Sequence, residues 1–404
     1  MSTLDRALRT PPPPRRSGAG RIAVSLLERV LPGIEDGTLV VRLPHGAERR
    51  FGSGPERMLE IRDANLFRRI VTRPKLALGE GYQAGEWVSD DLAGVLDLLL
   101  RNAVAGGERH PILRRLAALR PRVNTRTGVL AARRNIAYHY DLGNEFFRLF
   151  LDETMTYSCG VFAHPQERLA DAQRRKLRLV CEKLELDERD HVLEIGCGWG
   201  SFALTAAGEF GARVTAVTIS AAQARLVRER VVAAGLSERV EVVERDFRDL
   251  EGTYTKIASI EMLEAVGERL WRPFFATCDR LLAPGGRACV QTILVPDERF
   301  ARYRRSSDWI ERYVFPGCLI PSLGALRSAS GEASSLALRS SEEIGFHYPT
   351  TLRAWRERFH ARLDEVRALG YDEHFVRTWD FYLASCEALF RVGLMRDAQL
   401  VMER

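Results

Sequence analysis

The sequence contains no long hydrophobic run. None of its apolar stretches reaches the about 18 residues that a membrane-spanning helix needs, which excludes such a helix. Cysteines are few: the seven residues are an odd number and no two have CxxC spacing, so neither a full disulfide framework nor a zinc site is indicated. Residues 1–20 carry four Arg and four consecutive Pro in place of the hydrophobic centre of a secretory signal. We therefore expect a cytoplasmic protein with a flexible basic arm.

Neither sign of charge dominates the whole chain, but one segment is strongly basic. Lys and Arg number 60 against 54 Asp and Glu, and the formal charge of +6 favours an anionic partner without requiring one. Between residues 101 and 135, nine Arg face a single acid, Glu108. Ile112, Leu116 and Leu119 fall on one helical face there, which is typical of an amphipathic helix on an anionic lipid surface. A solvated linker helix docked on a neighbouring domain would show the same composition.

The length of 404 residues predicts at least two domains, because single hydrophobic cores rarely exceed about 300 residues. A helix pattern at 24–34 and an alternating strand pattern at 37–46 predict that the first domain is a small α+β module. We divide the chain into a flexible basic arm, an N-terminal α+β domain, an Arg-rich linker and a catalytic domain, at 1–20, 21–105, 106–135 and 136–404.

Glycines punctuate the end of the first domain. Gly79, Gly81 and Gly85 predict a loop, because glycine is unfavourable inside a helix. Asp90 or Asp91 would then cap the helix that follows.

The second half of the chain alternates between strand and helix patterns. Short runs rich in Val and Ile predict strands at 191–195, 213–217, 239–244, 256–260 and 287–293. Ser220 can cap the intervening helix at 221–234, and Gly235 stands where its C-terminal cap belongs. This order predicts an α/β fold with a mostly parallel, doubly wound sheet. From Arg299 onward the pattern is aromatic and helical, which indicates a cap that faces the substrate or the closing elements of the same domain.

A glycine-rich loop, LEIGCGWGSF, ends the first of these strands and opens a helix. Its glycines remove side chains where a ligand approaches the backbone. The spacing is E-x-G-x-G-x-G rather than the G-x-G-x-x-G of dinucleotide loops, and it resembles motif I of Rossmann-like S-adenosylmethionine-dependent methyltransferases. An acid such as Glu194 suits the ammonium and sulfonium of that cofactor. A nucleotide oxidoreductase or a non-catalytic copy of the fold remains the alternative.

Further motifs along the chain resemble the cyclopropane-fatty-acyl-phospholipid synthases and the related mycolic acid methyltransferases. In order they are NIAYHYDLGNEFFRLFLDETMTYSCGVF, VTAVTISAAQ, RDFRDL, SIEMLEAVG, DRLLAPGGR, DWIERYVFPG and FHYPTTLRAW. The resemblance covers roughly residues 55–404 and implies the methyltransferase fold described above, with a smaller N-terminal domain that engages lipid.

The resemblance implies two sets of site residues. Positions that hold S-adenosylmethionine in the family correspond to Tyr157, Ser158, Glu194, Gly196, Gly198, Thr218, Gln223 and Asp246. Positions that hold a bicarbonate ion near the reacting methyl group correspond to Cys159, Glu264, Gln291, Ile293 and Tyr348. Cys386 matches a further cysteine motif of the family, although a buried helical cysteine would explain it equally well.

The chemistry that the resemblance implies is methyl transfer to an isolated double bond, which is a weak nucleophile and needs an activated methyl group held in line and shielded from water. The transfer leaves a carbocation on the neighbouring carbon. If bicarbonate removes a proton from the new methyl group, a cyclopropane ring closes. The family usually has His where this chain has Gln291 and Ala265. These departures leave open a second product, a methyl-branched or furan-precursor chain formed without ring closure.

Other function classes predict other residues. An amino-methylating nucleic-acid enzyme would carry an N/D-P-P-Y/F motif where this chain reads SIEMLEAV, so we expect no nucleic-acid substrate. A non-catalytic lipid- or S-adenosylmethionine-binding protein would not need Cys159, Glu264 and Tyr348. The expected partners are unsaturated phospholipid acyl chains and an anionic membrane surface, at the inner face of the cell membrane, with a homodimer as a further possibility and no metal.

Overall fold

A computed structural model describes residues 34–105 and 142–404. The described residues form two compact units: the smaller comprises residues 34–105 and 377–381, and the larger comprises residues 142–376 and 382–404. The predicted arm at 1–20, the Arg-rich linker at 106–135 and nearly all of the predicted helix at 24–34 lie outside the described residues.

The smaller unit contains a four-stranded sheet with three helices. The strand order is β2-β1-β3-β4, in which β1 pairs antiparallel with β2 and parallel with β3. The strand pattern predicted at 37–46 corresponds to β1, whose residues are almost all buried. The elements are β1 (Gly37–Arg42), β2 (Glu48–Ser53), β3 (Glu56–Ile61), α2 (Asn65–Thr72), α3 (Ala77–Gln83), β4 (Trp87–Val88) and α4 (Leu92–Ala105).

Of the three glycines predicted to form a loop, only Gly85 does so, in the turn after α3 with a φ of 71°. Gly79 and Gly81 lie inside helix α3. A Cβ atom on Gly81 would lie 2.7 Å from Leu66 Cδ1, so close helix packing explains the glycine at this position. Asp91 behaves as predicted, because its carboxylate accepts the backbone N–H of Gly94 at 2.9 Å in the first turn of α4.

The larger unit is built on a seven-stranded sheet in the order β10-β11-β9-β8-β5-β6-β7. The five strands predicted from the sequence, β5 to β9, are parallel to one another, which confirms the predicted α/β fold. Two further strands near the C-terminus, β10 and β11, extend the sheet in the antiparallel sense. The strands are β5 (His191–Ile195), β6 (Arg213–Thr218), β7 (Val240–Glu244), β8 (Tyr254–Ile260), β9 (Leu282–Leu294), β10 (Ala337–Glu343) and β11 (Arg396–Glu403).

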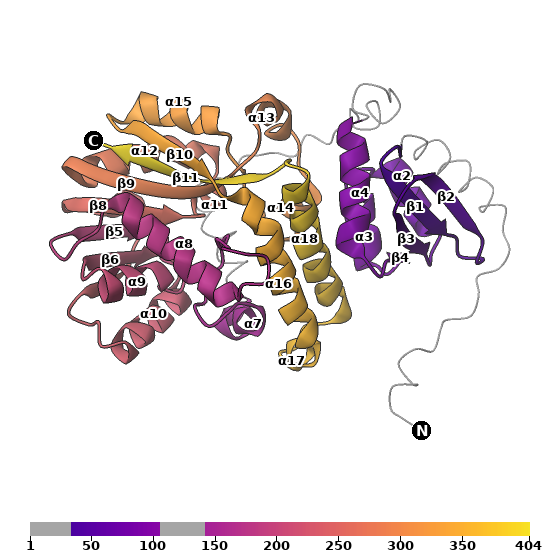
Figure 1. The fold of residues 1–404 in the computed structure, drawn as a ribbon, viewed down its shortest axis with the longest axis horizontal. Coiled ribbons are helices and arrows are strands. Elements are labelled where there is room, and N and C mark those ends of the chain that lie inside the picture. The colour runs from indigo at the N-terminus through magenta and orange to yellow at the C-terminus, as the bar shows by residue number, and fades with distance from the viewer. Residues whose placement is uncertain (1–33, 106–141) are drawn as a thin grey trace. The chain divides into compact units, whose positions relative to one another are not determined.

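Helices cover this sheet, whose central strand β5 is almost entirely buried. All residues of β5 except His191 are buried, as expected for a parallel strand with helices on both faces. Figure 1 shows α8 crossing the near face, with α9 and α10 beside it. The helices before β9 are α7 (Gly143–Phe150), α8 (Leu169–Leu184), α9 (Ser201–Glu209), α10 (Ala221–Ala233), η2 (Phe247–Asp249), α11 (Leu263–Val266) and α12 (Glu268–Leu281). Ser220 caps α10 by accepting the N–H of Gln223, as predicted.

The chain after β9 adds mainly helices. Those helices are α13 (Asp297–Tyr303), α14 (Trp309–Tyr313), α15 (Leu323–Ala333), η3 (Gly345–His347), α16 (Tyr348–Ala361), α17 (Leu363–Ala368) and α18 (Glu373–Arg391). Helices α16 and α18 lie side by side (Figure 1) and are joined by Tyr348 against Phe390, whose ring centroids are 4.3 Å apart. They form one wall of the second pocket described below.

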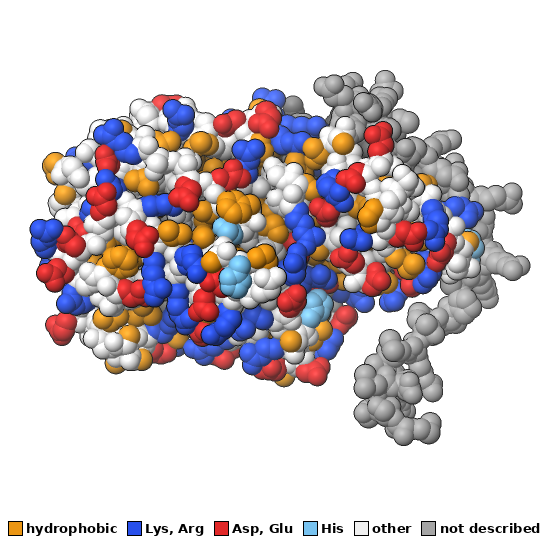
Figure 2. All heavy atoms as spheres, in the orientation of Figure 1, with side chains coloured by type: hydrophobic (Ala, Val, Ile, Leu, Met, Phe, Trp, Pro, Cys, Tyr) orange, Lys and Arg blue, Asp and Glu red, His pale blue; other side chains and the backbone are white. Residues whose placement is uncertain are grey.

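Basic and acidic side chains are intermixed over the face that Figure 2 shows. On α8, for example, Arg174 pairs with Asp171 at 2.9 Å and Arg178 pairs with Glu209 at 2.5 Å, so neighbouring acids balance these arginines. Within residues 34–105 and 142–404, no helix combines the length and hydropathy that crossing a bilayer requires.

Candidate active site

The glycine-rich loop lies between β5 and α9 and has a backbone that only glycine adopts easily. Gly196, Gly198 and Gly200 have φ values of 85°, 51° and 84°. A Cβ atom on Gly196 would lie 2.7 Å from Met262 Cγ, and one on Gly200 would lie 2.8 Å from Val227 Cγ1. A Cβ atom on Gly198 would meet nothing within 4 Å, so its backbone borders open space. The loop therefore leaves its backbone accessible to a ligand at Gly198.

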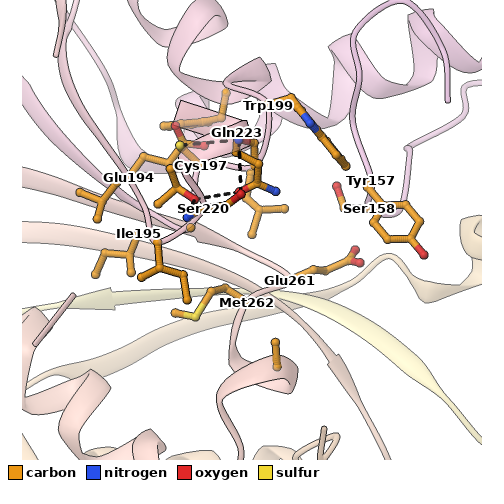
Figure 3. A pocket seen from close by; sticks show the side chains of 18 of the residues that line it. Tyr157, Ser158, Glu194, Ile195, Cys197, Trp199, Ser220, Gln223, Glu261 and Met262 are labelled. Atoms are coloured by element: carbon orange, nitrogen blue, oxygen red, sulfur yellow. Dashed lines mark hydrogen bonds between the residues drawn. The ribbon is translucent and has the colours of Figure 1, made fainter. Parts of the chain in front are cut away.

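A pocket opens beside this loop, at the carboxyl ends of the parallel strands, where ligands bind in doubly wound sheets. It is lined by all eight residues that we expect to hold S-adenosylmethionine: Tyr157, Ser158, Glu194, Gly196, Gly198, Thr218, Gln223 and Asp246. Figure 3 shows Glu194 and Gln223 on one side of this pocket and Tyr157 and Ser158 on the other. We call it the first pocket.

Buried polar atoms without a protein partner line the first pocket. Glu194 Oε2 and Gln223 Nε2 have no hydrogen-bond partner among the described residues, while Gln223 Oε1 accepts the Thr218 hydroxyl at 2.8 Å. Burial raises the pKa of Glu194 to about 8, and the positive charge of Lys176 opposes the shift. Buried polar atoms normally have partners, so these atoms fit a polar, positively charged ligand such as S-adenosylmethionine.

Asp246 is held by its own turn. It caps the short helix η2, and its carboxylate accepts the side chain of Arg248 at 2.7 Å. Its position just after β7 places it among the residues that line the first pocket. The sheet therefore brings residues from β5, β6 and β7 to one edge.

A second pocket of different character adjoins the first. Most of its wall is apolar or aromatic, and its lining includes Tyr157, Glu261, Glu264, Ala265, Ile293, Ile310, Phe315, Ile320, Tyr348, Leu352, Tyr382, Cys386, Phe390 and Met395. Tyr157, Glu261 and Ala265 line both pockets. A ligand in the first pocket and an apolar chain in the second would therefore meet beside these three residues.

Three hydrogen-bond donors converge on the carboxylate of Glu261. The backbone N–H of Cys159 donates to Oε1 at 2.8 Å, the amide of Gln291 donates to the same oxygen at 2.9 Å, and the hydroxyl of Tyr348 donates to Oε2 at 2.6 Å. The donors come from the loop before α8, from β9 and from α16. Glu261 follows β8 with a φ of 49°, a left-handed conformation that residues other than glycine rarely adopt. Figure 3 shows its side chain extending toward Tyr157 and Ser158.

Glu264 lies one turn further along and has different partners. Its Oε1 accepts the backbone N–H of Ile293 and the hydroxyl of Thr292, the latter at 2.9 Å, while Oε2 has no partner among the described residues. Burial, and then the negative charge of Glu261, raises the pKa of Glu264 to about 8. At neutral pH the protonated form of Glu264 is therefore favoured.

Two more buried ionisable groups, Asp397 and Lys176, interact electrostatically with Glu261. Asp397 on β11 accepts the amide of Gln291 at 2.9 Å, and burial followed by the charge of Glu261 raises its pKa well above the ordinary value. Lys176 on α8 is fully buried and donates to the Ser158 hydroxyl at 2.6 Å. Burial lowers the pKa of Lys176, whereas Glu261 opposes that shift. Burial and the charge of Glu261 thus both favour the protonated form of Asp397.

The residues predicted to hold bicarbonate are brought together, but the arrangement does not fit that anion. The backbone N–H of Cys159, the amide of Gln291 and the hydroxyl of Tyr348 already donate to Glu261, and the N–H of Ile293 donates to Glu264. A bicarbonate ion could be held here only by taking these donors from the two carboxyl groups that already accept them.

The two predicted cysteines lie in different places. The Cys159 thiol is fully buried and donates to backbone carbonyl groups of Gly160 and Ile344, so its main chain, not its sulfur, contacts Glu261. Cys386 on α18 lines the second pocket. Burial raises the pKa of both thiols, which favours their unreactive protonated form. No group of metal-ligating side chains is arranged to hold an ion in the described part of the chain.

Sequence reasoning missed Glu261, Asp397 and Lys176. Glu261 directly follows a predicted strand. Ligand-binding residues gather at the carboxyl ends of parallel strands, so the sequence contained a signal for Glu261. Lys176 could have been noticed because it falls on the buried face of α8. Asp397 had no such signal, because β11 was not predicted.

Comparisons with known proteins agree on one family. The family model described as "Mycolic acid cyclopropane synthetase" matches residues 129–400. Tuberculostearic acid methyltransferase UfaA1 of Mycobacterium tuberculosis is 43% identical over 352 residues, which cover 84% of this chain and 81% of that protein. Cyclopropane-fatty-acyl-phospholipid synthase of Escherichia coli is 34% identical over 349 residues, which cover 86% of this chain and 87% of that protein.

The fold is also found in solved structures. The crystal structure of the mycolic acid cyclopropane synthase CmaA1 complexed with SAH and CTAB superposes with a TM-score of 0.63 at 28% identity. The match covers 71% of this chain and all of that chain.

Proposed function

The chain belongs to the mycolic acid cyclopropane synthetase family of S-adenosylmethionine-dependent methyltransferases, and from this premise we propose that it transfers a methyl group to the double bond of an unsaturated phospholipid acyl chain. The observation that carries the proposal is the junction of a polar pocket and an apolar pocket at Tyr157, Glu261 and Ala265. A membrane surface is the source of such chains, and the Arg-rich segment at 106–135 supplies the charge to approach an anionic one.

The first pocket would hold S-adenosylmethionine, whose sulfonium supplies an activated methyl group. Glu194 and Gln223 offer the unpartnered buried atoms to the polar ends of the cofactor, and Gly198 offers open backbone. Tyr157, Ser158, Thr218 and Asp246 line the same pocket at the ends of neighbouring segments. Their common role is to fix the methyl group toward the junction of the pockets.

The second pocket would hold the acyl chain. Its apolar and aromatic wall excludes water from a carbocation that water would otherwise capture. Ile293, Tyr348 and Cys386 belong to this wall, and Ala265 leaves room for the chain at the junction because it carries only a methyl group.

We propose a methylene-branched product rather than a ring. After methyl transfer, a hydride moves from the methylated carbon to the neighbouring cationic carbon, and loss of a proton from the new methyl group leaves a carbon–carbon double bond to that group. The similarity to a tuberculostearic acid methyltransferase supports this product, as does the replacement of the family's usual histidines by Gln291 and Ala265.

Lipid analysis tests the proposal. The chain is expressed in a host without such enzymes, and the cells are fed methionine with a fully deuterated methyl group. We expect acyl chains enlarged by one methylene unit that carries two deuterium atoms, with deuterium on an alkene carbon in the nuclear magnetic resonance spectrum. Deuterium in a cyclopropane ring would instead identify a cyclopropane synthase. Unlabelled lipids, together with tight cofactor binding, would identify a non-catalytic binding protein.

A further inference from the structure

We propose that Glu261 itself accepts the proton released from the methylated acyl chain, so that an internal carboxylate takes the place of a bound bicarbonate ion. This inference rests on the proposed function. The donors that we expected to hold bicarbonate from the sequence, namely the Cys159 N–H, the Gln291 amide and the Tyr348 hydroxyl, all point at the Glu261 carboxylate. The donors expected to hold an anion are therefore present, and the carboxylate of Glu261 accepts them.

Position distinguishes Glu261 from the other acids. It lines both pockets, so its carboxylate borders the space where the methyl group would pass from the cofactor to the acyl chain. Glu264 lines only the second pocket, and Asp397 lines neither. A proton acceptor must lie within hydrogen-bond reach of the proton it takes. Of these three acids, only Glu261 borders both the cofactor pocket and the acyl-chain pocket.

The groups around Glu261 hold it in place for proton transfer. Lys176 lines the first pocket, as Glu261 does, and burial favours the protonated form of Asp397. Tyr348 stays a hydrogen-bond donor because burial raises its pKa well above the ordinary value. A carboxylate with three fixed donors is also precisely oriented, which is what proton transfer from a C–H bond needs.

The step balances in atoms and charge. The new C–C bond forms from the alkene electrons as the S–CH₃ bond breaks, and the chain then carries the positive charge. After the hydride shift, the electrons of one C–H bond of the new methyl group form the C=C bond, and its proton moves to Glu261. The carboxylic acid that results is neutral and returns its proton to solvent after the product leaves.

The experiment compares variants with unsaturated phospholipid vesicles and S-adenosylmethionine in buffer depleted of carbon dioxide. We expect the wild-type protein to turn over at the same rate with and without added bicarbonate. Glu261→Gln should lose a factor of about 10² to 10⁴ in turnover, the contribution typical of a general base, while it still binds the cofactor. The exposed Glu238→Gln is the matched control and should behave as wild type.

A second variant guards against misfolding. The left-handed backbone at residue 261 accepts glycine readily, so Glu261→Gly should fold and leave the donors around an empty space. Added bicarbonate or formate should restore its turnover at least tenfold and should not affect Glu261→Gln. A wild-type rate that falls without bicarbonate, a Glu261→Gln rate equal to that of Glu238→Gln, or a Glu261→Gly variant that neither anion rescues would overturn the inference. Wild-type protein that methylates no lipid would instead remove the proposed function, and the inference with it.

Discussion

Two carboxylates on opposite sides of the first pocket differ in what surrounds them (Figure 3). Glu194 keeps an unpartnered oxygen beside the glycine loop, whereas Glu261 receives three donors from three segments. An unpartnered acid is suited to bind a ligand, because it gains a partner only when the ligand arrives. An acid that the protein already orients is suited to chemistry, because little reorganisation remains. One pocket thus combines a recognition end, at Glu194 and the glycine loop, with a reaction end, at Glu261 and its three donors.

The largest expected effect comes from breaking the reaction end. Gln291→Met keeps the volume of the side chain but removes the amide that Glu261 and Asp397 share. Leaving buried carboxyl oxygens without that donor should lower the free energy of unfolding by about 3 kcal/mol. Urea denaturation measures this change, and the exposed Gln166→Met serves as the control, with an expected change within about 0.5 kcal/mol. Equal stability of the two variants would mean that the shared amide does not hold the reaction end together.

A smaller effect is expected at the recognition end, on the pH dependence of cofactor affinity. The pKa of Glu194 is about 8 without ligand, so the group is mostly protonated at neutral pH. A positively charged cofactor favours the carboxylate, so binding should release a proton, and affinity should rise up to tenfold per unit as pH rises toward 8 and level off above it. Calorimetric titrations in two buffers of different ionisation enthalpy count the protons. The same count in Glu194→Gln as in wild type would assign the proton to another group.

The smallest effect concerns the wall of the second pocket, which Tyr157 and Tyr382 both line. The hydroxyl groups of Tyr157 and Tyr382 lie 2.8 Å apart, and Tyr382→Phe removes one of them. We expect the free energy of unfolding to fall by about 1 kcal/mol. Thermal unfolding of Tyr382→Phe, Tyr157→Phe and the double variant forms a double-mutant cycle. Additive losses would show that this hydrogen bond contributes nothing to stability.

The recognition end could be predicted from the sequence because its residues follow one another along the chain. The loop from Glu194 to Gly200 directly follows β5, and Thr218 and Gln223 lie at the next strand-to-helix junction. The glycine loop was recognised from its local pattern, and the resemblance supplied Thr218 and Gln223. The carboxyl ends of parallel strands share one edge, so these residues come together.

The reaction end could be predicted only in part. The resemblance supplied Cys159, Gln291 and Tyr348, yet the carboxylate that they contact was not foreseen, because it depends on packing among segments far apart in the chain. Strand β11, which carries Asp397, escaped notice because it lies after a long helical stretch, and β10 is polar and largely exposed. The helix α3 was misjudged for another reason, since close packing at Gly81 outweighed the low helix propensity of glycine.

The left-handed backbone of Glu261 has a consequence for how such a site can change over evolutionary time. At a φ of 49° glycine is the residue that fits with least strain. Each glutamate codon becomes a glycine codon by a single base change, so one mutation can remove the carboxylate at a backbone position that suits glycine, and the reverse mutation can restore it. An enzyme that needs a dissolved anion and one that does not would thus differ by a single mutation at residue 261. A lineage could change from one to the other as the supply of that anion in its surroundings changes.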